Sequence, residues 1–131
     1  MVQSKGLAKP YGIFKGYENQ KLDNFEKIKM TIQMLTDKLC GENKGIIDDP
    51  IILTMYSSDC PDLTIVDLPG ITRIPHGDQP QNIFQITVNM VEKYCSDPRT
   101  VILAVVPANA DPSTSDSLQM AMKLDPEGKR T

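Results

Sequence analysis

The chain has 131 residues, of which 40% are hydrophobic and 24% are charged, as in an ordinary globular domain. This composition excludes a disordered tail and a collagen-like fibre, and the length suits one domain. The 14 Lys and Arg residues against 17 Asp and Glu residues give a net charge of −3, so we expect no nucleic-acid partner and no general attraction to anionic membrane.

The first predicted element is a helix. Residues 1–21 show no sustained periodicity, so we expect loop or disorder there and leave them outside any assigned domain. Asp23 or Asn24 can cap the helix that follows, and Gly41 comes after its last periodic residue. Its apolar residues recur at spacings of three and four, which is one face of a helix: Phe25, Ile28, Ile32, Leu35 and Leu39. Residues 42–45 are polar and predict a turn.

Two short β-rich runs come next. Residues 51–56 and 63–66 are predicted to form strands joined by the turn-like residues 57–61. After a loop rich in proline and glycine, Pro80 suits the first turn of a second helix. The apolar positions of this helix recur at four, three and four, and Asp97-Pro98 ends it: Phe84, Val88, Val91 and Cys95.

The last third of the chain predicts a strand and a helix. Residues 100–106 are a continuous, β-branched apolar run, typical of a strand that is buried on both faces. Residues 109–115 form a polar loop, and a short helix over 118–124 ends at Asp125-Pro126-Glu127-Gly128. Strands that alternate with helices indicate an α/β layered fold.

Cysteine use and hydropathy bear on the cellular compartment. The cysteines are odd in number and form no C-x-x-C pair, so we expect three reduced thiols: Cys40, Cys60 and Cys95. No stretch approaches the roughly 20 apolar residues that span a bilayer. The N-terminus also has no apolar core of the kind found in signal peptides. We therefore expect a soluble, cytosolic chain.

One short motif carries chemistry. In Leu63-Thr64-Ile65-Val66-Asp67-Leu68-Pro69-Gly70 an acidic residue follows a predicted strand, and a glycine comes three positions later. Ligands of α/β sheets bind outside the carboxyl ends of the strands. An aspartate there can hold Mg²⁺ through water, and a glycine lets its backbone N–H approach a phosphate. By itself D-x-x-G is a weak signal, and a β-turn after a strand explains it better when nothing else supports the motif.

A longer set of blocks resembles the middle of the GTPase domain of the dynamin superfamily, which includes the dynamins and the myxovirus-resistance (Mx) proteins. The resemblance covers about residues 24–131 in five blocks: 43–46, 63–73, 77–80, 102–111 and 125–131. It implies a partial P-loop GTPase-type domain over residues 22–131, with a mixed, mostly parallel sheet flanked by helices. The implied activity is GTP binding and GTP hydrolysis that drives membrane remodelling or fission.

The resemblance also implies roles for particular residues. Asp67 corresponds to the aspartate that binds Mg²⁺ through water, and Leu68, Pro69 and Gly70 belong to the same nucleotide-contacting motif. Gly70 would touch the γ-phosphate, and Gly70 and Thr72 would serve catalysis. Residues 71–78 correspond to the mobile segment called switch II. Asn109 and Asp111 lie in the counterpart of the trans-stabilising loop, through which two GTPase domains meet; Asp111 could instead cap the following helix.

Two GTP-binding motifs have no counterpart in the printed sequence. It contains no G-x-x-x-x-G-K-S/T phosphate cradle and no T-K-x-D guanine-reading motif. We therefore expect these 131 residues alone neither to bind GTP tightly nor to hydrolyse it. An alternative function is a catalytically inactive interaction module that offers the loop at Asp111 and the helix over 25–39 to a partner. A third is an unrelated metal or acid–base enzyme using Asp67 with Glu92 or His76.

Partners and location also come from the resemblance. It implies a homodimer of GTPase domains and further self-assembly, with membrane contact made by regions outside these residues. It places the intact family in the cytoplasm, peripheral to membranes or microtubules. GTP and Mg²⁺ are the implied cofactors.

Overall fold

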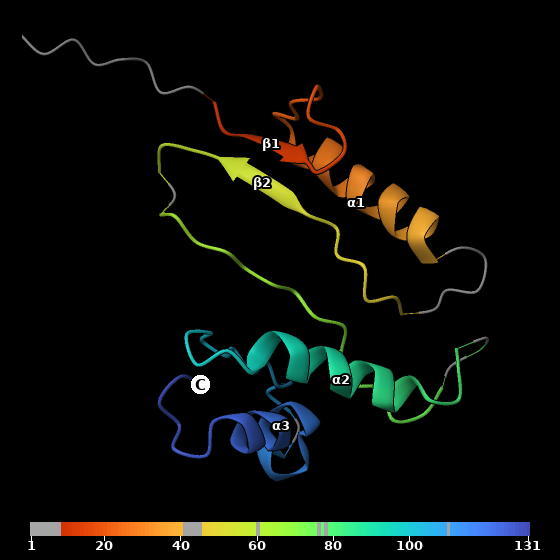
Figure 1. Cartoon of the computed structure of the whole chain (residues 1–131), viewed down its shortest axis with the longest axis vertical. Coiled ribbons are helices and arrows are strands. Elements are labelled where there is room, and N and C mark those ends of the chain that lie inside the picture. The colour runs from red at the N-terminus through yellow and green to blue at the C-terminus, as the bar shows by residue number, and fades with distance from the viewer. Residues whose placement is uncertain (1–8, 41–45, 60, 76, 78, 110) are drawn as a thin grey trace, which may run out of the picture. The chain divides into compact units, whose positions relative to one another are not determined.

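The computed structural model describes residues 9–40, 46–59, 61–75, 77, 79–109 and 111–131. The expectations for Gly41, residues 42–45, Cys60 and His76 lie outside these described residues. The chain divides into two compact units, Met1–Ile65 and Val66–Thr131 (Figure 1).

A pair of antiparallel strands organises the first unit. Strand β1 (Tyr11–Phe14) pairs with β2 (Leu53–Tyr56), with Tyr11 opposite Tyr56 and Phe14 opposite Leu53. The expectation of loop throughout residues 1–21 is therefore wrong at 11–14. The expected pairing of 51–56 with 63–66 is also wrong, because the partner of β2 is β1, which precedes it by about 40 residues in the chain. Phe14 is 2% exposed and is the largest buried side chain of this unit.

The helix predicted from Phe25 is confirmed as α1 (Phe25–Cys40). Asn24 caps it, since its Oδ1 accepts a hydrogen bond from the N–H of Glu26 at 2.8 Å. Ile28 is the buried residue of its apolar face and packs on the strand pair: a Cβ on Gly12 would lie 3.3 Å from Ile28 Cδ1 and 2.9 Å from Leu53 Cδ1. Glycine at position 12 thus lets helix and strand approach closely. Phe25, at 73% exposed, lies outside this contact.

Two helices and a short 3-10 turn make up the regular structure described in the second unit. They are α2 (Ile83–Cys95), the turn η1 (Pro112–Thr114) and α3 (Asp116–Leu124). Both predicted helices are thus confirmed, although α2 begins three residues after Pro80, whose carbonyl accepts from the N–H of Ile83 at 3.0 Å. The buried face of α2 is also rotated from the predicted one and comprises Ile83, Thr87, Val88, Met90 and Cys95.

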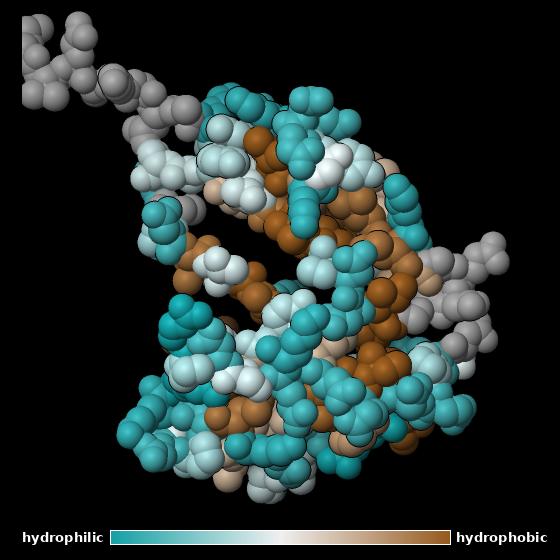
Figure 2. Space-filling model, viewed as in Figure 1, coloured by the Kyte–Doolittle hydropathy of each residue, from teal (hydrophilic) through white to brown (hydrophobic). Residues whose placement is uncertain are grey.

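The predicted strands 63–66 and 100–106 are not strands among the described residues. The β-branched run keeps the backbone extended, but a strand also needs a neighbour to complete its ladder of hydrogen bonds. The burial expected on both faces of 100–106 is wrong too: Val101, Leu103 and Val105 are 78%, 87% and 74% exposed. Ile65, in the earlier segment, is 80% exposed. Figure 2 shows such apolar surface on the molecule.

Arg130 joins three segments of the second unit. Its Nη1 donates to the carbonyls of Cys95 (2.8 Å) and Thr100 (3.0 Å), and its Nη2 donates to the carbonyl of Leu124 (2.7 Å). One guanidinium therefore bonds to carbonyls at the end of α2, at the start of the 100–106 segment and at the end of α3. The carbonyl of Arg130 accepts from the N–H of Ile102 at 2.6 Å, which holds the extended segment beside the C-terminal block.

Asp125 completes this junction. Its carboxylate accepts from the backbone N–H groups of Lys129 and Arg130 and from the hydroxyl of Thr131. The Arg130 N–H contributes most to holding the pKa of Asp125 below its ordinary value. Asp125 is 7% exposed, and Gly128 takes a positive φ of 62° in the turn between these partners. Residues 125–131 therefore end α3 and also connect it by hydrogen bonds to the end of α2 and to the segment 100–106.

Asp97, just after α2, gives a pH-dependent prediction. Arg99 donates to its carboxylate from Nη2 at 2.7 Å and from the backbone N–H at 2.9 Å, and these bonds lower the pKa of Asp97 from 3.8 to about 2. Because the folded pKa is depressed, this stabilisation is present above about pH 4 and is lost as the pH falls towards about 2. In an NMR titration, Arg99→Gln is expected to move the Asp97 midpoint up towards 3.8; an unchanged midpoint would contradict the assigned cause.

Two further observations concern thiols and membranes. Cys40 and Cys95 are free thiols, as expected, while Cys60 is outside the described residues. Within the described part of the chain, no helix combines the length and the apolar character needed to cross a lipid bilayer.

Candidate functional site

The D-x-x-G motif lies on an open stretch of chain. Asp67 is exposed at the end of the extended segment, Leu68 and Pro69 are half-buried, and Gly70 is exposed. No heavy atom lies within 4 Å of the position that a Cβ on Gly70 would take. The backbone at Gly70 is therefore accessible to a ligand, and the carboxylate of Asp67 faces solvent rather than a core.

The side chain of Thr72 forms a hydrogen bond within the same loop. Its Oγ1 donates to the carbonyl of Gly70 at 3.2 Å, two residues back. This bond holds the threonine beside the glycine. The two residues expected to serve catalysis are thus in direct contact, and this bond uses the carbonyl of Gly70 and not its N–H.

The loop with Asn109 and Asp111 is exposed and ordered by short-range bonds. Asp111 Oδ1 accepts from the N–H of Ser113 at 2.9 Å, and this bond lowers the pKa of Asp111. Asp111 therefore caps η1, while Ser115 Oγ accepts from Leu118 N–H at 3.3 Å and caps α3. The capping role weighed for Asp111 is real, but it serves the turn before the helix.

The donor set suits Mg²⁺ only as a weakly held, hydrated ion. Among the described residues, no three His, Cys, Asp or Glu side chains gather into a metal site. A single exposed carboxylate at Asp67 fits an ion that keeps several waters and is bound mainly by substrate phosphates. Glu92, weighed as a partner of Asp67, instead pairs with Lys123 at 2.7 Å, and His76 is outside the described residues.

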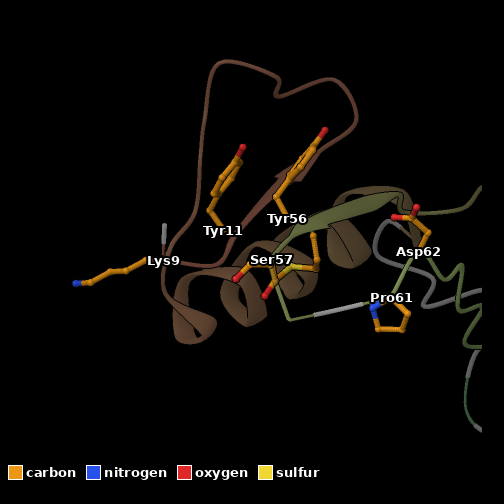
Figure 3. A pocket seen from close by; sticks show the side chains of 8 residues that line it. Lys9, Tyr11, Tyr56, Ser57, Pro61 and Asp62 are labelled. Carbon is orange, nitrogen blue, oxygen red and sulfur yellow. The ribbon is translucent and has the colours of Figure 1, made fainter. Parts of the chain in front are cut away.

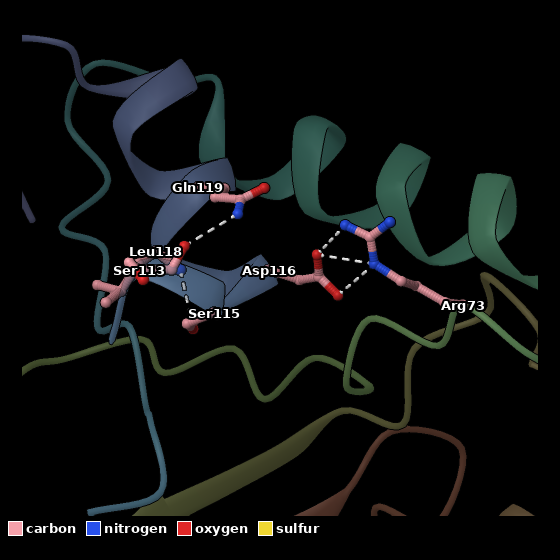
Figure 4. A network of polar contacts seen from close by, with 6 residues as sticks. All are labelled: Arg73, Ser113, Ser115, Asp116, Leu118 and Gln119. Carbon is pink, nitrogen blue, oxygen red and sulfur yellow. Dashed lines mark hydrogen bonds and ion pairs between the residues drawn. The ribbon is translucent and has the colours of Figure 1, made fainter. Parts of the chain in front are cut away.

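Sequence reasoning missed the contact that ties the segment after Gly70 to α3. Arg73 Nε donates to both carboxylate oxygens of Asp116, at 3.0 Å and 2.8 Å, and its Nη2 also donates to that carboxylate (Figure 4). The two residues are 43 positions apart. The sequence contains no local signal for the pairing, because neither position constrains the other through a helical or strand period.

The first unit has an open hollow of about 330 Å³. Tyr11 and Tyr56 stack there with ring centroids 5.0 Å apart, and Lys9, Ser57, Pro61 and Asp62 lie around them (Figure 3). None of the residues predicted to bind nucleotide or to serve catalysis lines this hollow. The candidate site is therefore the surface stretch at 67–73 with the loop at 109–115.

Asp67 and Gly70 are both exposed directly after the apolar residues 63–66. Comparison with known proteins then names the family. The model of the Dynamin family matches residues 3–131, and the chain belongs to that family. The match includes most of residues 1–21, which had no assignment from sequence alone.

The chain resembles several dynamins over most of its length. It is 43% identical over 121 residues to the dynamin-1-like protein of Danio rerio, covering 92% of this chain and 18% of that protein. It is 46% identical over 121 residues to dynamin-A of Dictyostelium discoideum (92% and 14%) and 43% identical over 132 residues to dynamin-1 of Bos taurus (100% and 15%). The chain is thus a stretch of a dynamin-type GTPase domain and spans less than a fifth of these relatives.

Proposed function

We propose that this stretch supplies the γ-phosphate-sensing part of a GTP-hydrolysing domain. The observation that carries the proposal is the exposed Asp67–Gly70 motif, in a chain of the dynamin family. Asp67 would hold Mg²⁺ through a water molecule, and the backbone N–H of Gly70 would donate to the γ-phosphate. The ion would supply positive charge to the phosphates of the substrate.

The chain's own residues position these groups. Thr72 Oγ1 donates to the carbonyl of Gly70 at 3.2 Å and so helps to fix the peptide that follows Gly70, next to the one whose N–H would face the phosphate. Asp111 is exposed on the loop capped at η1, where it can reach a second GTPase domain. Asp111 is ionised at neutral pH like any exposed aspartate, and a carboxylate suits contact with a basic group of the partner.

The finer architecture is also part of the proposal. Residues 63–66 and 100–106 would each form a strand of a mostly parallel sheet in a domain that has its remaining strands. Their exposed apolar side chains support this, because a parallel sheet buries both faces under helices. The residues at the ends of both segments, Asp67 and Asn109, would then share the carboxyl edge of the sheet.

Membership of the dynamin family also supports a proposal for cellular location and self-assembly. We place the intact protein in the cytoplasm, at membrane surfaces, where GTPase-domain homodimers and larger self-assemblies would drive remodelling or fission. Membrane contact is assigned to regions outside these residues. Microtubule association is kept as a family trait that would need its own test.

A chimera tests the proposal. In it, this chain replaces the matching stretch of the Danio rerio dynamin-1-like protein. The remaining residues of that protein would have to supply the phosphate cradle and the guanine-reading motif. We expect the chimera to hydrolyse GTP, while the 131 residues alone show no saturable binding of a fluorescent GTP analogue at micromolar concentrations. Circular dichroism establishes that both proteins are folded. A folded chimera without GTP hydrolysis would contradict the proposed function.

A further inference from the structure

The strongest unassigned feature is the ion pair between Arg73 and Asp116. The guanidinium of Arg73 binds the carboxylate of Asp116 in a bidentate arrangement. Nε donates to the two carboxylate oxygens at 3.0 Å and 2.8 Å, and Nη2 donates to Oδ1 (Figure 4). Such paired, charge-assisted bonds fix orientation as well as distance. The side chain of Asp116 is 25% exposed and that of Arg73 is 61% exposed, so the geometry of the paired bonds distinguishes this ion pair more than its burial does.

Both ends of the pair rest on ordered structure. Asp116 is the first residue of α3, where a negative charge also favours the helix N-terminus. Arg73 lies over the ring of Phe84, in the first turn of α2, at 5.4 Å from the ring centroid. Arg73, Phe84 and Asp116 also line a second hollow of about 240 Å³, which lies within the second unit and is lined as well by Ile71, Val88 and Met120. The arginine is therefore held between α2 and α3, while its backbone remains in the loop.

The pair also joins the two segments that follow the loops of the candidate site. Arg73 is three residues after Gly70, and Asp116 is five residues after Asp111. The second loop is attached to α3 by Gln119, whose Nε2 donates to the carbonyl of Ser113 at 3.3 Å (Figure 4). The loop at Gly70 and the loop at Asp111 are therefore connected by the Arg73–Asp116 ion pair and by the bond between Gln119 and Ser113.

We propose that Arg73 is a positioning residue that acts through Asp116. The pair latches the segment after Gly70 onto α3 and sets the place of the Gly70 backbone relative to the Asp111 loop. The assignment to catalysis rests on the proposed function, whereas the latch itself is a property of this chain. When a second GTPase domain binds the loop at Asp111 and restricts its movement, the Arg73–Asp116 pair also restricts the movement of Gly70.

NMR on the full chain tests the latch without nucleotide. Charge reversal by Arg73→Glu or by Asp116→Arg is expected to lower the backbone order parameters at 71–74 from about 0.85 to below about 0.6. The exchanged double variant, Arg73→Asp with Asp116→Arg, is expected to restore them. Lys123→Glu is the matched control, since it breaks the 2.7 Å pair between α3 and α2 without touching the loop. Order parameters that stay unchanged in both single variants would overturn the latch.

Kinetics of the chimera test the catalytic consequence. Arg73→Glu is expected to lower kcat about tenfold and to leave KM within about twofold, because orientation is lost and ground-state binding is kept. The exchanged pair is expected to recover most of that loss. A kcat reduced equally in the single and exchanged variants would show that Arg73 acts by itself, against the proposal. If the unaltered chimera hydrolyses no GTP, the proposed function fails, and the order parameters still decide the latch.

Discussion

Replacing Asp67 with alanine in the chimera is expected to lower the kcat of GTP hydrolysis by about 100-fold. Asp67 is exposed and is the only carboxylate in residues 67–70. Among the described residues, no cluster of acidic side chains could replace it as a ligand of Mg²⁺. Raising the Mg²⁺ concentration is expected to recover part of the rate, since the phosphates still bind the ion. Initial rates over a Mg²⁺ series measure both effects.

Asp62 provides the matched control for this prediction. It is an exposed aspartate five residues earlier, beside the hollow of the first unit and away from the motif. Asp62→Ala has the same charge change and is expected to leave kcat within about twofold. An Asp67→Ala chimera that keeps the full rate at every Mg²⁺ concentration would remove this residue from the proposed mechanism.

Replacing Arg130 with methionine is expected to lower the free energy of unfolding by about 3 kcal/mol, because three backbone carbonyls lose a charged donor. Methionine keeps much of the apolar stem, so the loss reports the hydrogen bonds more than the packing. Urea denaturation followed by circular dichroism measures the change. Hydrogen exchange is expected to accelerate at the amide of Ile102, whose acceptor is the Arg130 carbonyl.

Arg99→Met is the comparison for Arg130. Arg99 is also an arginine of the second unit, but its side chain is 89% exposed and pairs with Asp97 two residues away. Its removal is expected to shift the urea midpoint much less than removal of Arg130, because water screens the exposed pair with Asp97. Equal destabilisation by the two substitutions would mean that the three carbonyl contacts of Arg130 add nothing to stability.

The helices could be predicted because their signals are local. The apolar period, the Asn24 cap and the break at Asp97-Pro98 all act within a few residues, and α1, α2 and α3 follow them. The buried face of α2 was less predictable. Ile83 and Thr87 are fully buried, while Phe84 is 38% exposed, because neighbours decide which side of a helix is covered.

The strands failed for the opposite reason. A β-branched run favours extended backbone, but pairing depends on a second segment that can be far away in the chain. Residues 63–66 and 100–106 have the composition of strands and lack paired neighbours among the described residues. Tyr11–Phe14 had no strand signal in the sequence analysis, yet it pairs with β2 in full register.

The sequence by itself determined the family blocks, the three helices and the identity of the candidate residues Asp67, Gly70, Thr72, Asn109 and Asp111. Only the tertiary structure decided which charged groups meet. Arg73 joins Asp116 and Arg130 gathers three carbonyls across spacings that no local period encodes. Such contacts form because packing of α2 and α3 brings distant polar groups within hydrogen-bond reach, and partly shielded charges then select the partner that satisfies them.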